Sequence, residues 1–244
     1  MKLLKVLFTL IFVISISGRM FSQDADEIVN KYINAIGGLD KIKAINTIKL
    51  TGKVTAGSMD IPFSQICKRP QMVFMESTIQ GMTMKQGFDG TQGWTINPFM
   101  GKKEPDLMSK DAEKAIQRNA DFEGQLINYK DKGSKIELVG KEDLEGSQVY
   151  NIKLTDKNND ITNFYIDADS YLIVKQNDKL KFDTKEISSE SILSNYKLVN
   201  GVMFPFSIQS KSPDNPMGDA KIAVDTIETN FPVDDNMFKM PVTK

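Results

Sequence analysis

The sequence contains no histidine, and only one cysteine (Cys67) and one tryptophan (Trp94) among its 244 residues. The absence of histidine excludes histidine zinc sites, Ser-His and Cys-His nucleophile pairs, and histidine acid–base chemistry. A single cysteine cannot form an internal disulfide, and its place in a strand pattern favours a small buried hydrophobe. An enzyme built from this chain would therefore depend on carboxylates, lysines or tyrosines.

No pair of carboxylates stands out as the acid and base of a glycosidase. The acidic residues that we considered fit turns and surfaces better than a catalytic or metal site: Asp167, Asp169, Asp178, Glu186 and Glu190. The chain also lacks the basic patch that nucleic-acid binding requires. We expect a protein that is not an enzyme and binds no metal, cofactor or nucleic acid; a secreted hydrolase is the least favoured hypothesis.

Residues 1–22 have the layout of a secretory signal peptide. Lys2 and Lys5 precede a mostly apolar run from Val6 to Ile16, followed by small and polar residues. The alternative is a membrane anchor, but this run is too short for a hydrocarbon core of about 30 Å. Cleavage near Ser22 or Gln23 would leave 28 basic and 32 acidic side chains. Because no cysteine lies near that position, we expect a soluble mature protein without a lipid anchor.

The remaining chain, residues 24–244, is expected to form a single domain, since 40% hydrophobic and 26% charged residues are ordinary for a globular protein. Residues 25–36 carry one apolar helical stripe that ends at Gly37 and Gly38. Ser109 is a candidate N-cap for a second helix within residues 109–122. Alternating patterns predict about twelve strands, at residues 47–54, 59–69, 71–79, 81–88, 93–97, 136–139, 148–154, 162–167, 171–176, 188–198, 202–210 and 220–228.

This pattern predicts a mainly β fold with a few helices (α+β), in which one antiparallel sheet curls into a barrel or half-barrel. Its strands are rich in methionine between residues 59 and 108, which suits either a cavity for variable apolar ligands or ordinary core packing. Arg69 has the same parity as the apolar side chains of its strand. It either bonds acceptors across a cavity mouth or covers apolar surface with its stem.

Several motifs occur in the order found in one protein family. They are KRP at 68–70, FDGTQGWTINPF at 88–99, ADEIVNKYINAIGG at 25–38, FYIDADSYLIVK at 164–175, MFPF at 203–206 and VDDNMFKMP at 233–241. Together they resemble the LolA-like periplasmic lipoprotein carriers, in particular the outer membrane lipoprotein-sorting proteins of Bacteroidetes-type bacteria. The resemblance extends from about Asp24 to Pro241.

The resemblance implies an unclosed antiparallel β-barrel whose helices cover an apolar cavity. We expect eleven side chains to line it: Ile48, Leu50, Met59, Ile61, Phe63, Met72, Phe74, Met82, Met84, Trp94 and Ile96. The family's KRP arginine bonds to the helical lid and holds the empty cavity closed, a role that transfers to Arg69. The candidate lid helix carries Ala112, Ala115 and Ile116, with the N-terminal helix as the alternative lid.

The implied function is a soluble periplasmic carrier that shelters the acyl chains of lipoproteins, or other lipids, between the inner and outer membranes. Its implied partners are lipid acyl chains, an inner-membrane ABC lipoprotein exporter and an outer-membrane acceptor, and we expect a monomer. The alternative is an envelope sensor or interaction module on the same fold, similar to RseB. The lack of an anchoring cysteine disfavours an outer-membrane receptor similar to LolB.

Overall fold

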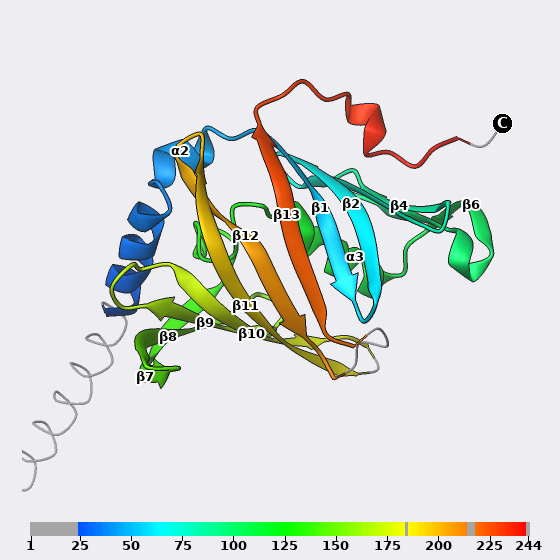
Figure 1. Cartoon of the computed structure of the whole chain (residues 1–244). Coiled ribbons are helices and arrows are strands. Elements are labelled where there is room, and N and C mark those ends of the chain that lie inside the picture. Colours follow the sequence, from blue (N-terminus) through cyan, green and yellow to red (C-terminus); the bar gives the residue numbers. More distant parts are fainter. Residues whose placement is uncertain (1–23, 184, 214–217, 243–244) are drawn as a thin grey trace, which may run out of the picture.

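The computed structural model describes residues 24–183, 185–213 and 218–242, so the signal-peptide prediction lies outside the described residues. Thirteen strands form one sheet in the order β6-β5-β4-β3-β2-β1-β13-β12-β11-β10-β9-β8-β7 (Figure 1). Each pair of neighbouring strands is antiparallel. Because β6 and β7 remain unpaired edges, the barrel is not closed, and the prediction of a mainly β fold with an unclosed antiparallel barrel is confirmed.

The strands lie close to the predicted ranges. They are β1 (Thr47–Ala56), β2 (Met59–Lys68), β3 (Met72–Ile79), β4 (Met82–Phe88), β5 (Gly93–Asn97), β6 (Lys102–Leu107), β7 (Lys135–Leu144), β8 (Ser147–Thr155), β9 (Ile161–Asp167), β10 (Ile173–Lys181), β11 (Glu186–Val199), β12 (Val202–Lys211) and β13 (Ala220–Thr229). The sequence analysis missed β6, whose residues KKEPDL show no apolar alternation. Its lysines and Pro105 suit an edge strand, because they discourage pairing with another chain.

Helical segments precede, interrupt and follow the strands. An N-terminal helix covers residues 24–35 and is followed by α2 (Leu39–Lys43). Short turns of 3-10 helix, η1 (Pro98–Met100) and η2 (Asp235–Met237), follow β5 and β13. Helix α3 (Lys110–Ala120) connects the two open edges of the sheet and begins as predicted, with the Ser109 hydroxyl accepting a hydrogen bond from the Ala112 amide.

The main core lies on the inner face of the sheet, which we define by the fully buried side chains of Ile48, Val73 and Phe88 in the first strands. Helix α3 packs against β3, β4 and β5, and adds Ile116 and Ala120 to this core. The N-terminal helix and α2 complete it at the other end of the molecule, beside β11 and β12 (Figure 1). The helices therefore fill the inside of the curved sheet.

The N-terminal helix ends in close contact with the loop between β11 and β12. Gly37 has φ +124, and a Cβ there would lie 2.2 Å from the Gly201 carbonyl oxygen, so only glycine fits. Beside it, the Met203 amide donates to the Ile36 carbonyl over 2.9 Å. These contacts fix the helix against β12, where it forms one wall of the site described next.

Candidate ligand cavity and the Arg69 cluster

A cavity of about 390 Å³ lies between the helices and the second half of the sheet. The N-terminal helix, α2, the end of α3 and the segment after it enclose one side, and the inner faces of β9 to β12 form the other. Its lining residues are Tyr32, Ile36, Ile42, Ile45, Arg118, Asn119, Asp121, Phe122, Glu123, Gly124, Gln125, Leu126, Phe164, Ile173, Gln176, Asp178, Leu193, Tyr196, Val202, Met203, Phe204 and Pro205. Both an apolar and a polar wall are present.

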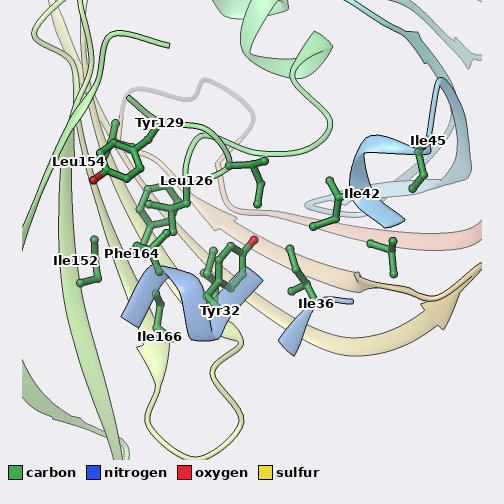
Figure 2. Packing of buried hydrophobic residues seen from close by; sticks show 14 of the residues in the cluster. Tyr32, Ile36, Ile42, Ile45, Leu126, Tyr129, Ile152, Leu154, Phe164 and Ile166 are labelled. Carbon is green, nitrogen blue, oxygen red and sulfur yellow. The ribbon is translucent and has the colours of Figure 1, made fainter. Parts of the chain in front are cut away.

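The apolar wall is built mainly from aliphatic and aromatic side chains of the helices and the sheet. Ile36, Ile42, Leu126 and Phe164 are all at most 6% exposed and belong to the main core. Figure 2 shows these side chains converging, with Tyr32 reaching from the N-terminal helix between them. A surface of this kind favours hydrocarbon, because apolar area is removed from water on binding.

The polar wall is a hydrogen-bonded network around Asp178 of β10. The Asp178 carboxylate accepts from Arg118 of α3 over 2.6 Å and from the Thr162 hydroxyl over 2.7 Å. Gln176 donates to its second oxygen over 2.8 Å. The Gln125 side-chain amide has one orientation in which both its oxygen and its nitrogen find partners. In that orientation the oxygen accepts from Arg118 over 2.6 Å and the nitrogen donates to the Thr162 hydroxyl over 3.1 Å. The buried charges are thus paired, as burial requires.

Arg69 follows directly after β2 and connects two segments that cover the cavity. Its Nε donates to the Ile45 carbonyl over 2.7 Å and its Nη2 to the Ile42 carbonyl over 3.0 Å, at the end of α2. Its Nη1 pairs with the Glu123 carboxylate over 2.8 Å, and its guanidinium lies 5.0 Å from the centre of the Phe122 ring. One side chain therefore joins α2 to the segment after α3.

The Glu123 carboxylate is shared with a second cation. Lys132 lies 3.3 Å from Glu123, pairs with Asp121 over 2.7 Å and donates to the Gly124 carbonyl over 2.9 Å. We call Arg69, Asp121, Glu123 and Lys132 the Arg69 cluster. The Glu123 side chain is only 10% exposed, so these interactions are little screened by solvent. These contacts of Lys132 join the two ends of the segment between Asp121 and Lys132 to each other.

The eleven predicted cavity residues lie on two different faces of the first half of the sheet. Cross-strand partners share a face. The register places seven on the inner face, namely Ile48, Leu50, Met59, Ile61, Phe63, Met82 and Met84. It places four on the outer face: Met72, Phe74, Trp94 and Ile96. None of the eleven lines the 390 Å³ cavity. Their contact with a ligand stays a prediction.

Trp94 shows what surrounds the residues of the outer face. Its ring is 1% exposed and tilted against Phe74, with ring centres 6.1 Å apart. The C-terminal segment crosses this face, so that the Trp94 Nε1 donates to the Phe238 carbonyl over 2.8 Å. A second layer of buried residues therefore exists outside the sheet. Strand alternation identifies two faces, but it does not say which one encloses a cavity.

The candidate lid residues also occupy different environments. Ile116 is 4% exposed, Ala112 is partly buried and Ala115 is exposed. The cavity instead meets the end of α3, through Arg118 and Asn119, and the segment from Asp121 to Leu126. Asp121 and Phe122 fall within the predicted lid segment 109–122, and Tyr32 lies on the alternative lid, whereas residues 123–126 were not selected from the sequence. The one available signal was the buried stripe of the N-terminal helix, which includes Tyr32.

The other sequence interpretations can be placed in the structure. Cys67 is fully buried, and burial raises the pKa of its thiol to about 12, as expected of an unreactive hydrophobe. None of the described helices is both long enough and apolar enough to cross a bilayer. Within the described residues, no three acidic or cysteine side chains come together as a potential metal site.

No protein-family model and no curated protein sequence matches this chain. Its structure nevertheless has the fold of the LolA superfamily. It matches a LolA superfamily protein from Nitrosomonas europaea with a TM-score of 0.59 and 12% identity, covering 88% of this chain and 97% of that one. It matches a DUF1329 family protein from Desulfovibrio piger with a TM-score of 0.60 and 11% identity, with the same coverage.

A third similar structure is an outer membrane lipoprotein-sorting protein domain from Vibrio parahaemolyticus. Its TM-score is 0.54 and its identity 12%, over 87% of this chain and 94% of that domain. Identities this low establish the fold and not the activity. The motif-based prediction of a LolA-like fold is confirmed by these matches.

Proposed function

We propose that this protein carries the acyl chains of lipoproteins or of other lipids between the inner and outer membranes, in the periplasm. The observation that carries the proposal is Arg69, whose three hydrogen bonds join α2 and the segment after α3, two parts of the cover of a cavity with an apolar wall. The LolA-like fold supports it, and so does the signal-peptide pattern of residues 1–22.

The energetics suit a carrier that must also release its cargo. Burying an acyl chain contributes about 0.8 kcal/mol per CH₂ group, so even partial shelter holds a lipid strongly. Charge-assisted hydrogen bonds contribute about 1–3 kcal/mol each to the closed form. If cargo entry separates α2 from the segment after α3, the closed Arg69 cluster competes with the cargo. Neither binding nor release requires a catalytic group, a cofactor or a metal.

The proposed partners are acyl chains, an inner-membrane exporter and an outer-membrane acceptor. Native mass spectrometry of the purified protein tests the first of these directly. We expect masses of bound lipid or acylated peptide that disappear after extraction and return when lipid is added. A protein that neither retains nor rebinds an acylated molecule is not a carrier.

Replacing the arginine tests its role as a latch. In Arg69→Leu the free energy that closes the cavity falls, so we expect cargo release to slow by about five- to a hundredfold. The fold should persist, since Glu123 keeps Lys132 as a partner. Lys68→Met is a matched control, because Lys68 precedes Arg69 and pairs at the surface with Asp235. Equal release rates in the Arg69 variant and the wild type would refute the latch.

A further inference from the structure

Tyr32 lines the cavity, and its hydroxyl has no protein partner among the described residues. Tyr32 is 9% exposed and lines the cavity from the N-terminal helix (Figure 2). Among the residues that the structure describes, none shares a hydrogen bond with its oxygen. Tyr196, the other tyrosine of the cavity, instead donates to the Ile173 carbonyl over 2.7 Å. Burial raises the pKa of Tyr32, so its hydroxyl remains a neutral donor.

The charged groups of the cavity are already neutralised. Arg118 is paired with Asp178, Lys132 with Asp121, and Arg69 with Glu123. An ionised head group placed in this cavity would lose its hydration and find no unpaired countercharge. The walls therefore favour a ligand without net charge.

The size of the cavity limits the number of chains. About 390 Å³ lies near the lower end of the range of about 300–1,000 Å³ that small-molecule pockets occupy. Such a volume suits one chain rather than several. The apolar wall accepts that chain, and the Tyr32 hydroxyl offers a hydrogen-bond donor that no described residue uses.

We propose that the cavity binds an uncharged single-chain acyl ester or amide, whose carbonyl oxygen accepts a hydrogen bond from the Tyr32 hydroxyl. This inference rests on the proposed carrier function and specifies the chemistry of its ligand. The acyl tail lies along Ile36, Leu126 and Phe164, and the polar end faces the network of Gln125, Gln176 and Asp178. Tyr32 acts as a specificity-determining residue for the carbonyl group.

The test compares two ligands that differ in the carbonyl. Monododecanoylglycerol and monododecylglycerol share a chain length and a neutral head group, but the second is an ether and has no carbonyl. In displacement of an apolar fluorescent dye, we expect the wild type to prefer the ester by about two- to tenfold. Tyr32→Phe should remove this preference. Tyr165→Phe is the control, because the Tyr165 hydroxyl contacts Asn177 outside the cavity.

Three further outcomes complete the test. The N-dodecanoyl amide of ethanolamine should behave as the ester does, whereas ionised dodecanoate at about pH 8 should bind about tenfold more weakly, because its charge would be buried unpaired. Equal binding of ester and ether, or a preference that survives in Tyr32→Phe, would overturn the role of Tyr32 and leave the carrier function intact. Failure of every ligand to bind would overturn both.

Discussion

The two halves of the sheet use their inner faces differently. In β1 to β5, side chains such as Val73 and Phe88 are buried beneath α3 and form solid core. In β9 to β12, the inner face is separated from the N-terminal helix and the segment after α3 by a cavity. The two halves also have different covers. Helix α3 brings Ile116 and Ala120 against the first, whereas the cover of the second combines buried apolar side chains, such as Ile28 and Leu126, with ion pairs around a cavity.

The two halves should therefore differ in how readily they open. Close-packed side chains lose many contacts when they separate, so the first half should stay closed. The cover of the second half is partly separated from the sheet by the cavity, and besides its apolar packing it depends on ion pairs, among them Arg69–Glu123 and Arg118–Asp178. We infer that the molecule opens at its second half while the first half serves as a rigid frame.

The largest expected effect is in the solid half. Phe88→Ala removes a ring that is 2% exposed and leaves a void beneath α3, so we expect a loss of about 3–5 kcal/mol in the free energy of unfolding. Urea denaturation monitored by circular dichroism measures it. A loss of less than about 1 kcal/mol in the free energy of unfolding would mean that the first half is not closely packed around Phe88. The proposed difference in packing between the two halves of the sheet would then be wrong.

A substitution in the cavity should separate binding from stability. Leu193→Trp places a larger side chain where Leu193 of β11 borders the cavity, so we expect acyl-ligand affinity to fall by about tenfold or more. The free energy of unfolding should change by less than about 1.5 kcal/mol, because the added atoms enter free space. Val139→Trp, on an exposed position of β7, provides the control for added bulk. Unchanged affinity in Leu193→Trp would show that the acyl ligand binds at another site.

The smallest expected effect concerns Asp26, which ties the N-terminal helix to the segment after α3. Partial burial acts to raise the pKa of Asp26, but hydrogen bonds from Tyr129 and Lys130 outweigh it and hold the pKa below its ordinary value of 3.8. The stabilisation is therefore complete above that value and lost as the pH falls below it.

Asp26→Asn should accordingly reduce the free energy of unfolding by up to about 1 kcal/mol at neutral pH, since the pair is partly exposed. The variant and the wild type should converge in acid, once the pH has fallen well below the ordinary carboxyl pKa of 3.8. Urea titrations at the two pH values measure this. A difference that persists in acid would show that the ionised Asp26 carboxylate is not what holds the helix.

Much of the fold could be predicted from local pattern. Alternation located twelve strands, and Ser109 marked the start of α3, because both signals depend on neighbouring residues alone. The edge strand β6 was missed because its charged residues suit solvent and carry no alternation. The parity of Arg69 indicated a side chain directed at apolar surface, but its partners lie 24, 27 and 54 positions away in the sequence.

The position of the cavity could not be predicted, because it depends on how a curved sheet meets its helices. Leu50 and Leu193 are similar apolar strand residues that both pack against the main core, yet only Leu193 borders the cavity. Phe122 and Gln125 lie in a segment without regular secondary structure, where periodicity gives no information. The methionine-rich stretch drew attention to the first half of the sheet, while the structure places the cavity in the second.

Photo-crosslinking with an acyl chain that carries a diazirine tests the location of the binding site most directly. After irradiation, peptide mass spectrometry identifies the residues that the chain touches. We predict labels on the N-terminal helix, on residues 122–126 and on β11 and β12, around Leu193 and Met203. Labels confined to the inner face of β2 and β4, at Phe63, Met82 and Met84, would contradict a site in the second half and favour the methionine-rich strands instead.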